Sequence, residues 1–187
     1  MLDDIKNACR TMEEGGVILY PTDTVWGLGC DATNADAVRR IYEIKQRAES
    51  KAMLVLVDSP VKVDFYVEEV PEIAWDVIDL ADKPITIIYP GARNLAANLL
   101  AGDGSVGIRV TKEEFSQRLC RQFRKAIVST SANVSGQPSP ANFSEISQEV
   151  KSRVDYMVTF RQNDTSRPQP SGIIKLGRGG VIRIIRE

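Results

Sequence analysis

The stretch VILYPTDTVWGLG, residues 17–29, decides how this chain folds. Its first four residues are apolar and predict a short buried strand. Pro21 ends that strand, because proline has no N–H to donate to a neighbouring strand. Two threonines, an aspartate and two glycines follow, and hydroxyl groups on a bendable backbone suit a small anionic ligand such as a nucleotide. A polar loop between a strand and a helix is the alternative interpretation.

Outward from this stretch, helical and strand patterns alternate along most of the chain. Asn34 has the position of a helix N-cap, and Thr111 with Glu114 forms a capping box before another helix. The helices are predicted at residues 5–12, 34–42, 71–78, 111–123 and 143–150. The strands are predicted at residues 17–20, 53–57, 85–89, 106–110, 126–129, 156–160, 173–176 and 181–185. Residues 161–170 are polar and contain proline, and they predict a loop.

This alternation predicts an α/β fold, a twisted sheet with flanking helices. The last two predicted strands form a hairpin, so we expect a mixed parallel and antiparallel sheet. The length of 187 residues, without an internal linker or repeat, predicts a single domain over residues 1–187.

The composition excludes several classes of function. There is no histidine, which rules out Ser-His-Asp and Cys-His catalysis and argues against a catalytic zinc site. Three scattered cysteines indicate buried reduced thiols rather than disulfides. The first residues lack a signal region and no apolar run is long enough to span a bilayer, so we expect a cytoplasmic protein without membrane contact. The net charge of −1 requires any anion site to be local.

Three cations, Lys45, Arg47 and Lys51, follow the helix predicted after residue 34. On a continuing helix Lys45 and Arg47 would diverge by roughly 200°, so they can share a ligand only if the chain leaves the helix between them. In that case three cations can neutralise a triphosphate. The alternative is a solvated helix end that favours cations through its dipole.

Two later segments carry polar groups next to apolar strands. Ser131 and Asn133 leave the strand predicted at 126–129, where ligands bind in open α/β sheets; a turn rich in Ser, Asn and Gly is the alternative. Arg109 lies within an apolar strand and requires a partner, which is either a structural carboxylate or the carboxylate of a ligand. Residues 27–32 fit GxGxxA, but Pro21 separates them from the strand, and there is no Walker loop.

Taken together, YPTDTVWGLG, IYEIKQR with Lys51, SVGIRV, STSANVSGQPSP and PSGIIKL resemble the YrdC/TsaC family of threonylcarbamoyl-AMP synthases. The resemblance runs from about residue 16 to residue 186 and implies one YrdC-like (YrdC/RibB-like) domain of the short form. Three segments depart from the family pattern: residues 81–84, Trp26 after the TxTV motif of residues 22–25, and Gly172 after Pro170-Ser171.

The resemblance also implies roles for individual residues. The Lys-x-Arg and Ser-x-Asn signature of the family falls on four residues that are expected to be catalytic: Lys45, Arg47, Ser131 and Asn133. The residues expected to contact ATP are Arg47, Lys51, Ser105, Asn133, Ala141 and Arg186. Those expected to hold L-threonine are Thr24, Arg109, Ser131 and Ser171. No residue is expected to bind a metal; Mg²⁺ is expected to arrive with the nucleotide.

The implied reaction joins L-threonine, bicarbonate and ATP into threonylcarbamoyl-AMP and pyrophosphate, which requires no protein nucleophile. The product is expected to pass to a separate transferase that modifies tRNA. Two alternatives of the same fold stay open. One is a protein that binds double-stranded RNA through a basic face, for which the candidate patch is Arg118, Arg121, Arg124 and Lys125. The other is a paralogue without synthase activity. A weak contact between the enzyme and RNA is compatible with the main hypothesis.

Overall fold

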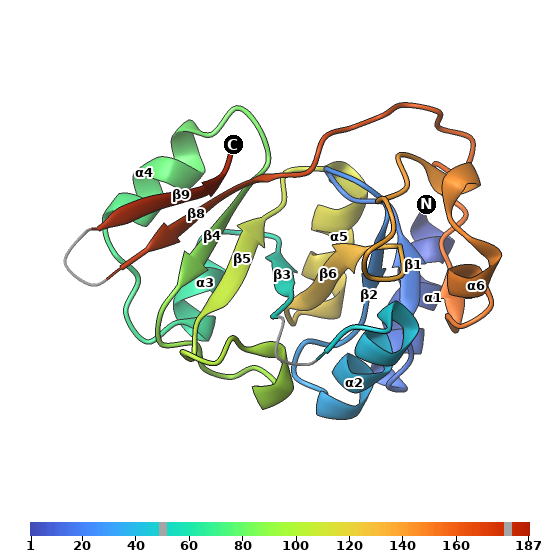
Figure 1. Cartoon of the computed structure of the whole chain (residues 1–187), viewed down its shortest axis with the longest axis horizontal. Coiled ribbons are helices and arrows are strands. Elements are labelled where there is room, and N and C mark those ends of the chain that lie inside the picture. The colour runs from blue at the N-terminus through green and yellow to red at the C-terminus, as the bar shows by residue number, and fades with distance from the viewer. Residues whose placement is uncertain (49–51, 178–180) are drawn as a thin grey trace.

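The computed structural model describes residues 1–48, 52–177 and 181–187. A sheet of nine strands in the order β7-β1-β2-β6-β3-β5-β4-β8-β9 runs through the described part of the chain (Figure 1). The strands are β1 (Ile18–Tyr20), β2 (Gly27–Gly29), β3 (Leu54–Val57), β4 (Ile85–Tyr89), β5 (Val106–Val110), β6 (Ile127–Ser131), β7 (Tyr156–Met157), β8 (Gly172–Leu176) and β9 (Ile182–Arg186).

Three neighbouring strand pairs are parallel, namely β1–β7, β3–β5 and β4–β8, and the other neighbours are antiparallel. The mixed sheet predicted from the sequence is therefore confirmed, as is the antiparallel closing hairpin β8–β9. The α-helices are α1 (Leu2–Glu13), α2 (Ala35–Lys45), α3 (Val61–Tyr66), α4 (Ile73–Leu80), α5 (Glu114–Phe123) and α6 (Gln148–Lys151). Two 3₁₀ turns are η1 (Ala97–Leu99) and η2 (Phe143–Glu145).

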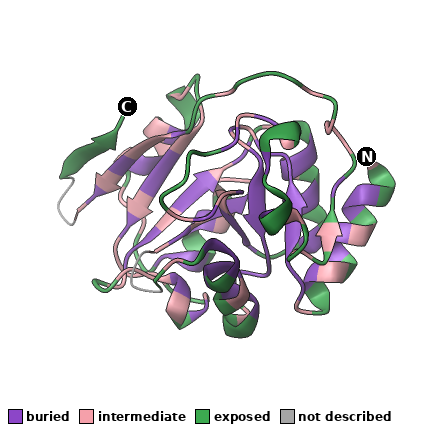
Figure 2. Cartoon of the chain, turned by 45° about the vertical axis from the view of Figure 1, so that its right-hand side comes forward, coloured by how far each residue is buried: buried purple, intermediate pink, exposed green. Residues whose placement is uncertain are grey.

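The core lies between the sheet and its helices. Helices α1 and α5 contact each other behind the strands in the view of Figure 1, and their inward faces are apolar. Figure 2 shows the central strands as buried, whereas the helices alternate between buried and exposed faces and β9 is exposed throughout. All three cysteines are free and buried, as expected. Such a core holds the strands in register beneath the site described below.

Several predicted elements are confirmed with small shifts of their ends. The side chain of Asn34 caps α2 by accepting hydrogen bonds from two backbone amides, those of Asp36 and Ala37. Helix α4 begins two residues after Pro71, at Ile73. Residues 161–170 contain no regular helix or strand. The sequence therefore predicted most elements of the sheet and its flanking helices.

The strand β2 was missed, since its residues were interpreted as part of a loop. Glycine has a low strand propensity, but here it is required by packing. A Cβ atom on Gly29 would lie 2.6 Å from the ring of Tyr20 and 3.0 Å from the carbonyl of Val128. The hydroxyl of Tyr20 crosses the strand to donate a hydrogen bond to that same carbonyl at 3.1 Å. The absence of a side chain thus lets three strands lie close together.

The prediction of a capping box at Thr111 is wrong. Helix α5 begins at Glu114, and the carboxylate of Glu113 accepts hydrogen bonds from the backbone amides of Phe115 and Ser116. Thr111 is still held by the sheet, because its amide donates to the carbonyl of Val57 at 3.0 Å. A carboxylate at the helix N-terminus provides the same stabilisation as the predicted threonine.

Two predictions near the C-terminal third were too long. The helix expected at 143–150 is divided into η2 and α6, because the backbone is extended at Ile146 and Ser147 starts a new cap. The strand expected at 156–160 ends at Met157. The amides of Thr159 and Phe160 instead donate to the carboxylate of Asp4, at 2.8 and 3.1 Å. A tertiary contact with α1 therefore replaces the strand ladder.

Candidate active site

A cavity of about 330 Å³ lies on one face of the central strands. Seven of the residues singled out from the sequence line it: Thr24, Arg47, Ser105, Arg109, Ser131, Ser171 and Arg186. The sequence suggested a site at the carboxyl ends of strands; the cavity instead runs across the sheet face from β2 to β8. Antiparallel neighbours bring both kinds of strand end to one edge, so the strand-end rule for parallel sheets does not locate this site.

Strand periodicity explains which side chains meet. Successive side chains of a strand point to opposite faces, so residues two apart share a face. The cavity is lined in this alternation by Ser105, Gly107 and Arg109 from the β5 segment, whereas Ser129, Thr130 and Ser131 all reach it at the end of β6. A Cβ at Gly107 would lie within 3.2–3.3 Å of side chains on two neighbouring strands. Glycine and serine at these positions leave the space that the cavity occupies.

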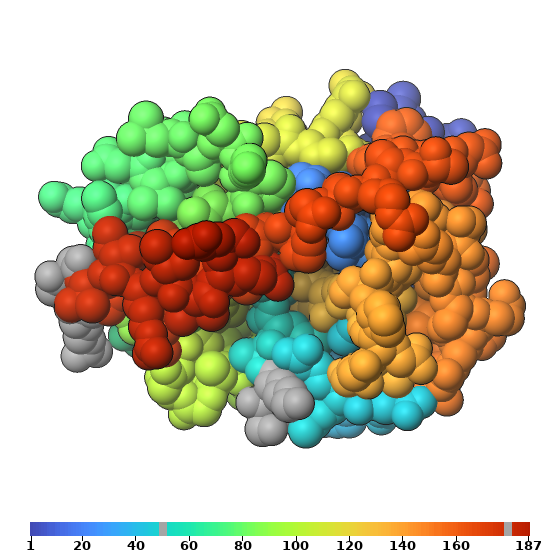
Figure 3. Space-filling view, turned by 45° about the horizontal axis from the view of Figure 1, so that its top comes forward, coloured from blue at the N-terminus to red at the C-terminus, as the bar shows by residue number. Residues whose placement is uncertain are grey.

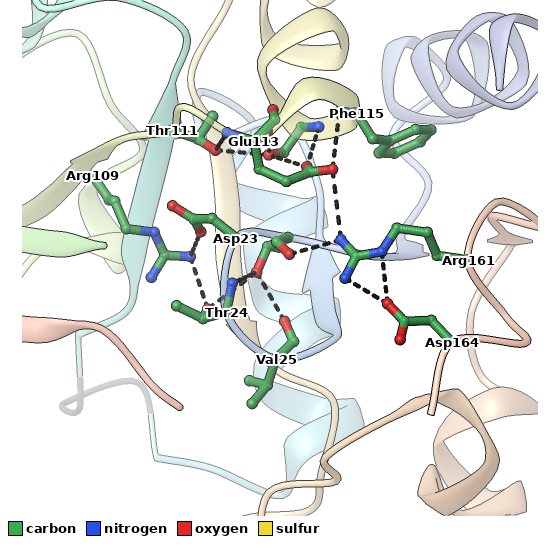
Figure 4. Close-up of polar contacts among 11 residues, drawn as sticks. Asp23, Thr24, Val25, Arg109, Thr111, Glu113, Phe115, Arg161 and Asp164 are labelled. Atoms are coloured by element: carbon green, nitrogen blue, oxygen red, sulfur yellow. Dashed lines mark hydrogen bonds and ion pairs between the residues drawn. The ribbon is translucent and has the colours of Figure 1, made fainter. Parts of the chain in front are cut away.

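Arg109 is the most buried cation of the cavity, with 3% of its side chain exposed. Its Nη2 lies 3.0 Å from Oδ1 of Asp23 and 3.3 Å from the hydroxyl oxygen of Thr24 (Figure 4). The structural carboxylate that the sequence left open is therefore Asp23. Within the described residues, the buried Nε of Arg109 has no hydrogen-bond partner. A buried donor without a partner destabilises the folded protein. Nε of Arg109 is therefore suited to donate a hydrogen bond to an anionic ligand.

The hydroxyl groups of Thr22 and Thr24 have a defined hydrogen-bond direction. Thr22 donates its single hydroxyl proton to the carbonyl of Val25 at 2.9 Å. The 3.1 Å contact between the two hydroxyls must then use the proton of Thr24. Because Thr24 also accepts from Arg109, its oxygen has one lone pair left at the cavity wall. That lone pair can receive a donor from a ligand, such as an ammonium or amide N–H.

Lys45 lies behind the cavity wall rather than in the cavity. Helix α2 ends at this residue, and Gln46 adopts the left-handed conformation with φ of 48°. The chain therefore leaves the helix between Lys45 and Arg47, which is the geometry that sharing a ligand required. Nζ of Lys45 donates to the carbonyls of Ser131 and Asn133 at 2.5 and 2.8 Å. Burial, and less strongly the charge of Arg47, lowers the pKa of Lys45 to about 8.

The Ser-x-Asn pair divides into one cavity residue and one framework residue. The hydroxyl of Ser131 lines the cavity and donates to Oδ1 of Asn133 at 2.5 Å. The amide nitrogen of Asn133 donates to the carbonyls of Val134 and Gln137. Asn133 and Lys45 thus hold the loop that carries Ser131. Arg47 lines the cavity, and its Nη2 donates to the carbonyl of Ala52 at 2.9 Å.

The remaining predicted residues are placed as follows. The hydroxyl of Ser105 donates to Asp103, and the hydroxyl of Ser171 pairs with that of Thr86 at 2.9 Å. Nε of Arg186 donates to the carbonyl of Ser171 at 2.9 Å, which brings β9 to the cavity. Partial desolvation where Arg186 meets the cavity, and less strongly the nearby charge of Arg109, lower the pKa of Arg186.

Two further residues, Lys51 and Ala141, are predicted to contact ATP. Lys51 lies outside the described residues. Ala141 does not line the 330 Å³ cavity. It lines a separate space of about 10 Å³ behind Thr24, and its amide donates to Glu145 at 3.0 Å.

The sequence assigned no individual role to Thr22, Asp23 or Arg161, which surround the turn that carries Thr24. Asp23 had a signal, since Arg109 required a partner and this carboxylate stands in the same motif as Thr24. Burial raises the pKa of Asp23, although Arg109 opposes the effect. Arg161 had no such signal, because it lies in a polar segment whose path only the tertiary structure gives. Figure 3 shows this orange-red segment crossing over blue atoms of the chain that follows β1.

The candidate basic patch for RNA is largely neutralised. Arg118 pairs with Glu114 at 2.8 Å and Lys125 with Asp31 at 2.6 Å. Arg121 lies 3.9 Å from Asp58. RNA binding needs a broad field of free positive charge, so this face does not favour the RNA alternative.

Two features are absent from the part of the chain that the structure describes. None of its helices combines the length and the apolar content that crossing a bilayer requires. No group of three or more Asp, Glu, Cys or His side chains within the described ranges is arranged to hold a metal ion.

Comparison with known proteins agrees with this architecture. The family model described as telomere recombination (Sua5/YciO/YrdC) matches residues 10–187. A protein of Halorhodospira halophila named threonylcarbamoyl-AMP synthase is 32% identical over 178 residues, which cover 95% of this chain and 92% of the relative.

Three solved structures have the same fold. A variant of Sua5 from P. abyssi matches with a TM-score of 0.86 at 25% identity, over 97% of this chain and 55% of that chain. Sua5 from P. abyssi in complex with L-threonine matches with a TM-score of 0.82 at 24% identity, over 95% and 52%. YciO from E. coli matches with a TM-score of 0.86 at 23% identity, over 100% and 90%. The chain belongs to the Sua5/YciO/YrdC family.

Proposed function

We propose that this protein is an L-threonylcarbamoyladenylate synthase, which makes threonylcarbamoyl-AMP and pyrophosphate from L-threonine, bicarbonate and ATP. One observation carries the proposal: three arginines from distant segments, Arg47, Arg109 and Arg186, line a single cavity of about 330 Å³. Cations that converge on a cavity of this size suit a ligand with several negative charges. The relatives named threonylcarbamoyl-AMP synthase support the same conclusion.

The amino-acid end of the cavity is assigned to Arg109, Thr24, Ser131 and Ser171. The unpaired Nε of the buried Arg109 can donate to the carboxylate of L-threonine. The free lone pair of Thr24 accepts an N–H from the amino group of the substrate, which becomes the carbamate N–H. The complex of P. abyssi Sua5 with L-threonine supports the choice of amino acid.

The nucleotide is assigned to Arg47, Ser105 and Arg186, with Lys51 as a further contact. Asn133 does not line the cavity and is assigned the role of holding the Ser131 loop. In this proposal Arg47 lies near the phosphates, where a fixed charge stabilises the charge that develops during transfer. Lys45 lies behind the cavity wall and positions the Ser131 loop by donating hydrogen bonds to its carbonyls. Mg²⁺ enters with the nucleotide, whose phosphate oxygens are its preferred ligands. Ala141 is assigned no contact, given its place outside the cavity.

The chemistry needs positioning rather than a protein nucleophile. The free amine of threonine adds to the carbon of bicarbonate, and loss of water gives the carbamate. An oxygen of the carbamate then attacks the α-phosphorus of ATP, and the bond from that phosphorus to the β-phosphate oxygen breaks to release pyrophosphate. Arg47 stabilises the charge on the leaving pyrophosphate, and a magnesium ion bound with the nucleotide would supply further positive charge there. The product then passes to a separate transferase that modifies tRNA.

Residues 1–187 are proposed to work as one YrdC-like domain in the cytoplasm. The same fold without synthase activity is less well supported, because the Lys-x-Arg and Ser-x-Asn pairs are both present and lie together at one wall of the cavity. Direct binding of double-stranded RNA is not favoured, since Arg118 and Lys125 of the candidate basic patch are paired with carboxylates.

The test is release of pyrophosphate from ATP, measured with threonine and bicarbonate each present or omitted, together with mass detection of threonylcarbamoyl-AMP. We expect release only when both co-substrates are present. An Arg109→Gln variant is expected to lose activity, whereas Arg118→Gln, which changes an exposed arginine on α5, is expected to keep it. Pyrophosphate release that is indifferent to threonine or bicarbonate contradicts the proposal.

A further inference from the structure

Arg161 joins three separate segments next to the turn that carries Thr24. Its Nε and Nη2 form a fork on Oδ2 of Asp164, at 3.1 and 2.9 Å. Its Nη1 donates to the carbonyl oxygen of Thr22 at 3.3 Å and lies 3.6 Å from Oε1 of Glu113 (Figure 4). One guanidinium therefore connects the 161–170 segment, the turn after β1 and the N-terminus of α5.

The position of Arg161 is itself fixed from the neighbouring residues. The ring of Phe160 stacks on that of Phe115, with centroids 5.5 Å apart. The amides of Thr159 and Phe160 are bonded to the carboxylate of Asp4. Arg161 adopts a left-handed backbone conformation, with φ of 65°, which is uncommon outside glycine and asparagine. Strongly held neighbours and an unusual backbone indicate that the direction of this side chain is specified rather than incidental.

We propose that Arg161 is a positioning residue for the amino-acid substrate and acts through Thr22 on Thr24. This inference rests on the function proposed above and extends it to a residue outside the cavity. Arg161 does not line the 330 Å³ cavity. It lines the space of about 10 Å³ on the other side of the Thr24 turn, together with Thr22, Thr24 and Asp164.

The coupling runs through a short chain of hydrogen bonds. Arg161 holds the carbonyl of Thr22 from outside the turn. The hydroxyl of Thr22 accepts from the amide of Thr24 at 3.0 Å and contacts its hydroxyl at 3.1 Å. Thr24 in turn accepts from Arg109. Loss of the outer contact lets the turn move, so the lone pair of Thr24 and the direction of Arg109 change together.

A second effect of Arg161 is electrostatic. The charge of Glu113 contributes to the raised pKa of Asp23, after the larger effect of burial. Arg161 lies next to Glu113 and offsets that charge. Without the guanidinium, Glu113 repels the ionised form of Asp23 more strongly, which weakens the ion pair that orients Arg109. Both effects act on the amino-acid end of the cavity and leave the nucleotide end unchanged.

The experiment compares wild type with Arg161→Met, Arg161→Lys and the matched control Arg118→Met, an exposed arginine that also pairs with a carboxylate. KM for threonine, KM for ATP and kcat are measured by pyrophosphate release. We expect Arg161→Met to raise KM for threonine about 10-fold, which is the effect of losing one charge-assisted hydrogen bond. KM for ATP is expected to change less than about 2-fold. Arg161→Lys is expected to restore part of the threonine affinity, and Arg118→Met to resemble wild type.

Hydrogen exchange of the peptide that covers residues 20–28 gives a readout without turnover. The amide of Thr24 is expected to exchange faster in Arg161→Met than in wild type or Arg118→Met. If Arg161→Met does not fold, Asp164→Asn removes the forked partner and is expected to raise KM for threonine about 3-fold. Equal effects on threonine and ATP, or unchanged exchange at residues 20–28, overturn the inference. A wild-type enzyme without threonine-dependent turnover overturns the proposed function alone, since the exchange experiment still tests the role of Arg161.

Discussion

Replacement of Lys45 by methionine tests the environment of the Lys-x-Arg motif. Lys45 is only 2% exposed, and burial lowers its pKa from 10.5 to about 8. Between these values the unfolded chain binds a proton that the folded chain has released. The free energy of unfolding therefore rises with pH across this window, and the gain is complete above pH 10.5 and absent below pH 8.

The magnitude follows from the same shift. One pKa unit corresponds to about 1.36 kcal/mol, so Lys45 contributes a pH-dependent change of about 3 kcal/mol. Lys45→Met has no titrating group and cannot show this change. The difference in free energy of unfolding, wild type minus variant, is expected to increase as the pH rises from about 8 to 10.5.

Urea denaturation of both proteins at several pH values measures this difference, and Lys6→Met serves as a control for the loss of a surface lysine. Removal of the ammonium also frees the carbonyls of Ser131 and Asn133, so pyrophosphate release is expected to fall in the variant at every pH. Parallel stability curves for wild type and Lys45→Met would refute the reasoning, because they would mean that Lys45 keeps its ordinary pKa in the folded protein.

Three further outcomes are expected. Arg47→Ala lowers kcat/KM for ATP about 100-fold in the pyrophosphate assay, the scale of a lost electrostatic contact in the transition state; a near-normal rate contradicts its role. Arg109→Met leaves Asp23 as an unpaired buried carboxylate and lowers the free energy of unfolding by about 3–5 kcal/mol, most of which returns in the double variant with Asp23→Leu. Gly29→Ala places a methyl group 2.6 Å from a buried tyrosine ring and costs about 1–3 kcal/mol, whereas Gly102→Ala, which meets nothing within 4 Å, leaves the urea midpoint unchanged.

The sequence by itself determined the elements whose signals are local. The N-cap at Asn34 was readable because a cap depends on a side chain and the amides two or three residues later. The strand at residues 106–110 was readable because its run of apolar residues is a local signal. The condition that the chain leaves its helix between Lys45 and Arg47 needed only helix geometry, and the left-handed Gln46 meets that condition, although Lys45 itself does not line the cavity.

The tertiary structure decided what depends on close approach between distant segments. The strand β2 exists because Tyr20 and Val128 leave no room for a side chain at Gly29, whereas glycine on its own argues against a strand. The burial of Lys45 behind the cavity wall likewise depends on where the Ser131 loop passes. Such contacts leave no periodic pattern in the sequence and can oppose the local propensity, since they are set by packing between segments that lie far apart in the chain.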